Sequence, residues 1–368
     1  MNREIKDLGI HISDGNYSSK YPRSEEFVKE GVPFIRANNL VNGEVTDEDM
    51  YFITPEKHAI LLKGHLQEGD VLITTRGNIG QVGIVPKRHI DSNINAQLVL
   101  LRTNPKELYN RYLLWALQSQ SVKKQYQTLQ TGTALKQLPV GKLEQVSIKV
   151  TDIISQHNIA DNLDKIYKII NDRKKELNLL DDLIKARFVE MFGDYRTNNR
   201  EFETHCGSEL FKFSSGKFLP ESKRFYDGVP VYGGNGIAFF TDEPLIDYPT
   251  VIIGRVGAWC GNVRTVIEPV WITDNAIFIK EFKTNKFTLE FITELMQVMD
   301  FHQYADFSGQ PKITQKPLEN LSYLTPPLEM QNEFTDFVKQ IDKSKVAVQK
   351  ALDEAQLLFD SLMQEYFG

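Results

Sequence analysis

Cysteine and long apolar runs are both scarce in this sequence. Only Cys206 and Cys260 occur among 368 residues, too few thiols for a disulfide framework or a four-cysteine metal site. No apolar run approaches the roughly 18 residues needed to cross a bilayer, and the charged start of the chain is unlike a secretory signal. We therefore expect a cytoplasmic protein that does not contact a membrane.

Catalytic signatures are missing as well. The glycine-rich runs at 77–83 and 254–261 follow apolar strands, but neither matches a dinucleotide fingerprint or a phosphate-binding loop. The 7 histidines include no pair at metal-binding spacing on a helix, and no G-x-S-x-G elbow frames a nucleophile. We expect tight turns at the glycines, with no catalytic residue and no metal site. An unrecognised enzyme using these glycine runs remains an alternative.

The net charge of −6 does not favour a nucleic-acid partner, but the charge is unevenly distributed. Residues 1–150 carry an excess of Lys and Arg, whereas each later segment is net acidic. A basic groove is therefore a local expectation only, and bulk charge does not support it.

Two stretches carry apolar residues at alternating spacings of four and three, which predicts a coiled-coil seam. The first lies in a helix expected from Asp152 to Phe192, and the pattern returns 175 residues later. A helix of about 40 residues is roughly 60 Å long, so each seam needs a partner of equal length. We expect the two helices to pair antiparallel. The predicted seam residues are Ile159, Leu163, Ile166, Ile170, Leu177, Leu180 and Ile184 in the first helix, and Phe334, Val338, Ile341, Val348, Leu352, Phe359 and Leu362 in the second.

The segments before the two helices repeat one order of elements. In the first, strands are expected at 32–36 and 95–101, and residues 69–77 are expected to form a turn, a buried strand and a glycine stop. A helix at 108–127 and a polar loop at 130–136 follow. In the second, strands are expected at 228–232, 249–257 and 274–279, then a helix at 291–296 and a loop at 308–312. Such a duplication predicts an α+β fold with two tandem α/β domains, separated by the two long helices and related by a pseudo-twofold axis. The expected boundaries are 1–150 for the first domain, 151–194 for the first helix, 195–325 for the second domain and 326–368 for the second helix.

Polar loop residues recur at matching places in both domains, and Arg, Lys, Asn and Gln are the side chains that read base edges or hold phosphates. We match Arg76 and Asn78 with Arg255 and Asn262, and the loop at 133–137 with residues 310–315. The candidate DNA contacts are Arg36, Asn38, Asn39, Arg76, Asn78, Thr133, Lys136 and Gln137 in the first domain, and Tyr232, Asn235, Arg255, Asn262, Gln310 and Lys312 in the second.

These motifs, in this order, resemble the DNA-specificity subunit of a type I restriction-modification system, a phage-defence enzyme. The similarity covers nearly the whole chain. It is carried by V-P-F-I-R at Val32, G-D-V-L-I-T-T-R-G at Gly69, T-G-T-A-L-K at Thr131, V-P-V-Y-G-G-N-G at Val229, S-G-Q-P-K at Ser308, and the helix openings at Gln156 and Pro327.

The resemblance implies two target-recognition domains, each binding one half of an asymmetric, interrupted sequence in double-stranded DNA. It implies that the paired helices dock two modification (methyltransferase) subunits, and that restriction (translocase and nuclease) subunits join the complex. S-adenosylmethionine, ATP and Mg2+ are then expected on those partners, with no cofactor on this non-catalytic chain. A type IIB-like assembly, and a scaffold whose domains bind peptide or glycan, are the other readings that the sequence leaves open.

Overall fold

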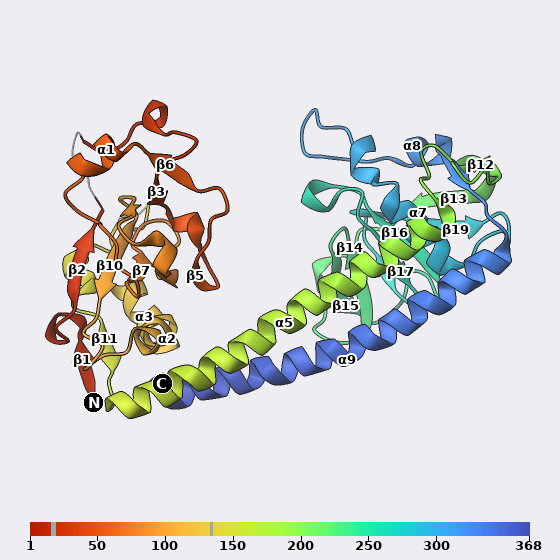
Figure 1. The fold of residues 1–368 in the computed structure, drawn as a ribbon. Helices are drawn as coiled ribbons and strands as arrows, with labels where there is room; N and C mark the ends of the chain where they lie inside the picture. Colours follow the sequence, from red (N-terminus) through yellow and green to blue (C-terminus); the bar gives the residue numbers. More distant parts are fainter. Residues whose placement is uncertain (16–19, 133–134) are drawn as a thin grey trace. The chain divides into compact units, whose positions relative to one another are not determined.

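The computed structural model describes residues 1–15, 20–132 and 135–368. The chain forms two compact units, which we call unit 1 (residues 1–173 and 351–368) and unit 2 (residues 174–350) (Figure 1). Both divisions fall inside a long helix, so each unit contains part of both long helices, whereas the predicted domains exclude them. Among the described residues, no helix is both long and apolar enough to cross a membrane.

Unit 1 contains three sheets. A six-stranded sheet has the order β2–β10–β7–β8–β5–β4, a three-stranded sheet has the order β6–β3–β9, and β1 pairs with β11. The strands are β1 (Asn2–Glu4), β2 (His11–Asp14), β3 (Val32–Ile35), β4 (Leu40–Val41), β5 (Gly43–Val45), β6 (Tyr51–Ile53), β7 (Val71–Thr74), β8 (Val82–Ile84), β9 (Asn93–Ile94), β10 (Leu98–Arg102) and β11 (Ser147–Lys149). The short helices are α1 (Pro55–Ile60), α2 (Asn110–Gln118), α3 (Gln120–Leu129) and α4 (Val140–Leu143).

Unit 2 repeats this plan with fewer strands. Its sheets have the orders β13–β19–β16–β17, β15–β14–β18 and β12–β20. In each unit the middle strand of the three-stranded sheet pairs parallel with one neighbour, β3 with β9 and β14 with β18. The strands are β12 (Thr204–Cys206), β13 (Phe211–Ser215), β14 (Val229–Gly233), β15 (Gly236–Thr241), β16 (Thr250–Gly254), β17 (Val263–Val266), β18 (Trp271–Ile272), β19 (Ala276–Phe282) and β20 (Ser322–Leu324). The short helices are α6 (Gly207–Leu210), α7 (Leu289–Val298) and α8 (Gln315–Asn320).

Two expected elements of unit 1 were wrong in detail. The single helix expected at 108–127 is two helices, because Ser119 is extended and its hydroxyl accepts from the Val122 amide as the N-cap of α3. The strand expected from residue 95 begins only at Leu98, because Asn95 and Gln97 form a turn in which the Asn95 side chain accepts from the Gln97 amide at 3.1 Å.

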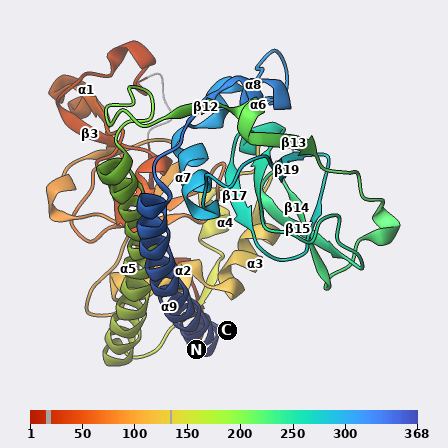
Figure 2. The same ribbon diagram turned by 90° about the vertical axis from the view of Figure 1, so that its right-hand side faces the viewer.

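The long helices are α5 (Ile153–Phe192) and α9 (Leu328–Phe367), and they pack antiparallel in each unit (Figure 2). In unit 1 the rings of Tyr167 and Phe359 lie 5.8 Å apart, and in unit 2 the rings of Phe188 and Phe334 lie 5.6 Å apart. The side chains at all fourteen predicted seam positions are buried or half-buried. The helices therefore bury their apolar stripes against each other and against the short helix beside them.

One buried glutamine fixes the start of each long helix. The Gln156 side chain donates to the carbonyls of Glu107 and Thr151 and accepts from the Tyr109 amide. Gln331 repeats all three bonds in unit 2, donating to Lys286 and Pro326 and accepting from Thr288. Both glutamines are fully buried, so each ties its long helix to the loop that leads into α2 or α7.

Candidate nucleic-acid interface

In unit 1, two loops that are far apart in sequence form one surface. The loop after β7 and the polar loop near residue 135 are joined where Leu138 donates to the Thr75 carbonyl at 2.8 Å and Gly77 to the Lys136 carbonyl at 3.3 Å. Gly77 has φ +74°, a left-handed conformation that glycine adopts without strain. Gln137 pairs with both Arg76 and Thr131. The polar residues predicted from separate motifs therefore lie together.

Unit 2 builds the same pair of loops. Ile313 donates to the Arg255 carbonyl and Gly257 to the Pro311 carbonyl, each at 2.9 Å. Gly257 is also left-handed, with φ +79°, and Lys312 pairs with Val256 and Asp306. We call these two joined loops in each unit the loop pair.

The hydrogen bonds correct the predicted matching of the two loop pairs by one residue. Ile313 bonds to Arg255 as Leu138 bonds to Thr75, so Arg255 is the counterpart of Thr75 and not of Arg76. Lys312 occupies the doubly paired position of Gln137. The order of motifs was correct, but register between distant segments is set by backbone bonds that sequence spacing does not reveal.

A turn in each unit links the loop pair to the end of the three-stranded sheet. In unit 1 the Asn95 amide donates to the Ile35 carbonyl, and the Thr75 amide donates to the Gln97 carbonyl. In unit 2 Thr273 donates to Tyr232, and Arg255 donates to Asn275. The candidate residues after β3, and those at β14, therefore adjoin the loop pair of the same unit.

Arg36 and Asn39 take different positions at the end of β3. The Arg36 guanidinium lies 3.3 Å from the Tyr51 ring centroid and donates to the Asp49 carbonyl at 2.5 Å. Asn39 is fully buried, and its amide accepts from the Arg36 backbone and donates to the Glu48 carbonyl. Because the oxygen and the nitrogen of that amide both bond to the backbone of the turn, Asn39 is not free to contact DNA as predicted. Asn38 beside it is exposed.

The remaining candidates differ in exposure. Those with exposed side chains are Asn78, Lys136, Gln137, Asn235, Gln310 and Lys312, and those that are half-buried are Arg76, Tyr232, Arg255 and Asn262. Burial raises the pKa of Tyr232 above its usual value, so this hydroxyl stays protonated. Asn262 is the last residue of the loop after β16 and lines a cleft described below. Thr133 lies outside the described residues.

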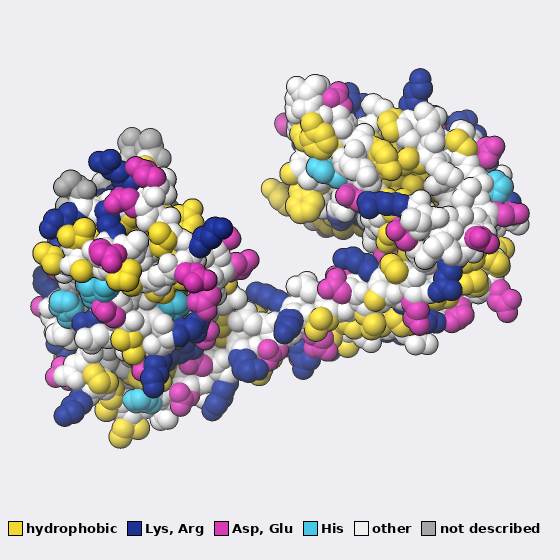
Figure 3. Space-filling model, turned by 45° about the horizontal axis from the view of Figure 1, so that its top comes forward, with side chains coloured by type: hydrophobic (Ala, Val, Ile, Leu, Met, Phe, Trp, Pro, Cys, Tyr) yellow, Lys and Arg dark blue, Asp and Glu magenta, His cyan; other side chains and the backbone are white. Residues whose placement is uncertain are grey.

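The units present no single-sign surface on the face shown in Figure 3, where Lys and Arg side chains are interspersed with Asp and Glu. Sequence reasoning also missed several exposed aromatic side chains in unit 2, notably Tyr226, Trp259 and Phe307. Phe307 lies within the loop pair, two residues before Gly309. The search for DNA contacts selected charged and amide side chains, so it passed over aromatic residues. Only their position near glycines in the sequence could have pointed to these exposed rings.

A cleft of about 1100 Å³ opens in unit 2 between β17, α7 and the long helices. Its lining includes Glu294, Ile184 and Asp342. Glu294 is 8% exposed, and its buried Oε1 has no hydrogen-bond partner. Burial raises the pKa of this carboxyl, against the opposing effect of Lys185 and Lys345.

The equivalent region of unit 1 holds a smaller hollow of about 250 Å³, and aromatic rings pack beside it. Trp115 lies 5.2 Å from Tyr167 and 5.4 Å from Phe359, centroid to centroid, and its Nε1 donates to Asp164 at 2.8 Å. Asp164 also forms an ion pair with Arg111 at 2.7 Å. By position in the repeated helices, Trp115 corresponds to Glu294. The two units therefore differ where each short helix meets the long pair.

Comparison with known proteins identifies the family. The sequence profile described as "Type I restriction modification DNA specificity domain" matches residues 1–179 and 199–355. The chain belongs to this family. It is a specificity subunit of a type I restriction-modification system, a non-catalytic DNA-recognition subunit. This confirms the resemblance seen in the motifs, and with it the predicted α+β repeat.

Relatives of this specificity subunit match over different lengths. A type I specificity subunit of Mycoplasma genitalium is 22% identical over 359 residues, which cover 89% of this chain and 91% of the relative. The specificity subunit of the EcoprrI enzyme of Escherichia coli is 27% identical over 160 residues, covering 43% of this chain and only 38% of the relative.

The fold of this specificity subunit is shared with solved structures. The crystal structure of a type I system S subunit from M. genitalium aligns with a TM-score of 0.64 and 19% identity, covering 100% of this chain and 96% of that one. A chain from a study of complex assembly and conformational transition in a type I system aligns with a TM-score of 0.55 and 14% identity, covering 100% of this chain and 97% of that one.

Proposed function

We propose that this specificity subunit reads a bipartite, asymmetric DNA sequence, with the loop pair of each unit contacting one half-site. The observation that carries the proposal is the recurrence of one loop pair on equivalent strands of both units. Each loop pair joins a glycine turn to a polar loop, and each presents Lys, Gln or Asn side chains to solvent. The loop pairs differ in sequence, so the two half-sites differ as well.

Apolar side chains on the long helices support docking of modification subunits there. Large apolar residues remain exposed along the helices after they have paired, and a docked protein would bury them. They are Ile154, Ile169, Leu357 and Leu358 in unit 1, and Leu179, Leu183, Val189, Leu328 and Val346 in unit 2. Two methyltransferase subunits carrying S-adenosylmethionine are the proposed occupants, and restriction subunits carrying ATP and Mg2+ join the same complex.

Substitution in the loop pairs tests the DNA contact. We expect Gln137→Ala and Lys312→Ala, each assayed with the modification subunits present, to weaken binding or relax specificity at one half-site only. Loss of a base-edge contact should weaken binding by about 1–3 kcal/mol and relax specificity at one base pair. Loss of a phosphate contact should lower the dependence of log affinity on log salt concentration by about 1. Fluorescence anisotropy against salt concentration, with methylation mapping, measures both.

The matched controls are Lys106→Ala in unit 1 and Lys280→Ala in unit 2. Lys280 lies on β19 near the end away from Arg255, and Lys106 follows the corresponding end of β10. Both side chains are exposed. Equal losses in the loop and control variants would overturn the assignment of the loop pairs, leaving membership of the family intact.

A further inference from the structure

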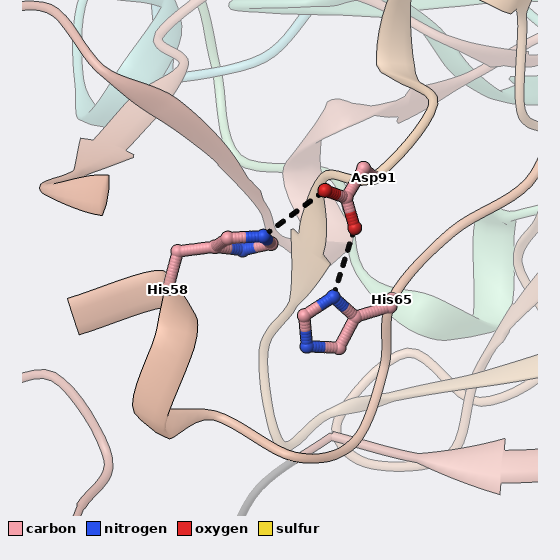
Figure 4. A group of neighbouring side chains, drawn as sticks. All are labelled: His58, His65 and Asp91. Carbon is pink, nitrogen blue, oxygen red and sulfur yellow. Dashed lines mark hydrogen bonds and ion pairs between the residues drawn. The ribbon is translucent and has the colours of Figure 1, made fainter. Parts of the chain in front are cut away.

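Three side chains from separate segments of unit 1 converge at one point (Figure 4). His58 comes from α1, His65 from the loop that follows, and Asp91 from the turn before β9. His58 Nε2 lies 3.2 Å from Asp91 Oδ2, and His65 Nδ1 lies 2.9 Å from Asp91 Oδ1. Among the described residues, this is the one group of metal-ligating side chains whose ligand atoms all lie within 4.8 Å of one another.

The second nitrogen of each imidazole ring faces an acceptor. His65 Nε2 bonds to the carbonyl oxygen of Leu61, which can only accept. His58 Nδ1 bonds to Asn93 Oδ1, and the orientation of that amide is fixed because Asn93 Nδ2 points at the Lys63 carbonyl at 3.5 Å. Asn93 is fully buried. Each ring therefore places its N–H on the side away from Asp91.

This arrangement directs lone pairs toward a carboxylate. In a neutral imidazole only one nitrogen carries hydrogen, so His58 Nε2 and His65 Nδ1 are both acceptors facing Asp91. Acceptors so placed repel each other unless each ring takes up a second proton or a metal cation lies among them. An outer N–H held by a carbonyl oxygen is also how proteins orient histidines that ligate metals, because it fixes the tautomer and the ring direction.

We propose that His58 Nε2, His65 Nδ1 and a carboxylate oxygen of Asp91 bind a divalent transition-metal ion, best matched by Zn2+. Two imidazoles and one carboxylate are a ligand set that zinc accepts at bond lengths of about 2.0–2.2 Å, with a fourth position for water. The ligand atoms need only small side-chain movements to reach those lengths. Asp91 is already held in the required turn, with φ +62° and its amide donating to the Leu66 carbonyl at 2.8 Å.

The ion would reinforce segments that hydrogen bonds already join, such as those between Leu66 and residues 91 and 92. It ties α1 and the following loop to the start of β9, the strand that pairs parallel with β3. Its role is therefore structural, to fix the three-stranded sheet of unit 1. Unit 2 has no counterpart among its described residues, because α1 has no equivalent between β15 and β16. The inference is independent of how the protein contacts DNA.

Zinc binding by the full-length chain, prepared without a histidine tag and stripped with a chelator, tests the proposal. Isothermal titration with ZnCl2 should show one ion per chain, and zinc should raise the melting temperature, since a ligand bound only by the folded state stabilises it. Co2+ in place of zinc should give the absorption of a tetrahedral site. His58→Gln, His65→Gln and Asp91→Asn should each reduce affinity at least tenfold; the asparagine retains a side chain that tolerates the left-handed turn.

The control is His205→Gln, because His205 in unit 2 also lies near two carboxylates, Glu203 at 3.6 Å and Glu209 at 3.7 Å. It should leave zinc affinity unchanged. Circular dichroism of each stripped variant separates loss of a ligand from loss of folding. The proposal is overturned if no stoichiometric binding occurs, or if binding survives all three ligand variants. Binding lost only in His205→Gln would overturn it equally.

Discussion

Gln156 and Gln331 show how much of this fold depends on single residues. Each is fully buried, and each makes three hydrogen bonds that join a long helix to the loop before a short one. Leucine has a similar size but would leave two carbonyls and an amide without their partner. Because unpaired buried polar groups are costly, the side chain stabilises its unit far more than an exposed glutamine does.

We predict that Gln156→Leu and Gln331→Leu each lower the free energy of unfolding of their own unit by about 2–4 kcal/mol. Hydrogen exchange followed by mass spectrometry should show faster exchange near residues 107–109 in the first variant and near 286–288 in the second. Gln340→Leu, on the exposed face of α9, is the control. If either variant increased hydrogen exchange in both units, the two glutamines would not stabilise their units separately.

At the scale of elements, the sequence predicted periodic features well and non-local register poorly. The four-three spacing placed both long helices, because one local pattern determines both the helix and its buried face. The positions of Arg255 and Asn39 could not be predicted in the same way. The first depends on a backbone bond between loops more than 50 residues apart, and the second on a turn that buries a polar side chain. The cluster of His58, His65 and Asp91 escaped for the same reason, since its members come from three segments.

The contact between α7 and the long helices carries a further prediction, at Glu294. The ordinary pKa of the carboxyl is 4.5, and burial raises it in the folded state. Below pH 4.5 the group is protonated in both states, whereas stability is lost as pH rises through the raised value, because the folded chain must then ionise a buried group. Glutamine does not ionise. We predict that Glu294→Gln stabilises unit 2 at neutral pH by about 1 kcal/mol, since one pKa unit corresponds to about 1.4 kcal/mol.

Thermal melts from pH 4 to 8 check this prediction. The advantage of Glu294→Gln should shrink as pH falls toward 4.5. Glu281→Gln, at an exposed position of β19, should show no such trend. An advantage that is independent of pH would mean that the gain comes from packing rather than from the charge.

At the scale of the whole molecule, the continuous helices allow a test of how the half-sites are spaced. Removing residues 174–180 together with 344–350 deletes one heptad from each helix and preserves the apolar spacing. Under the proposed function, a deletion of about 10 Å should shorten the gap between recognised half-sites by about three base pairs. Mapping of methylated adenines by sequencing measures the gap. A chain with alanine at exposed Lys174 and Lys343 should keep the original gap, and an unchanged gap after the deletion would refute the spacing role.

The difference between Trp115 and Glu294 has a consequence for assembly. If two copies of one modification subunit dock beside the short helices, one copy meets a small hollow beside aromatic rings and the other meets a larger, partly charged one. Two identical partner subunits would then occupy binding sites of different shape and charge. The two modification subunits would then bind with different affinities, in two distinguishable steps. A complex with one modification subunit would accumulate, and that subunit would favour one of the two units.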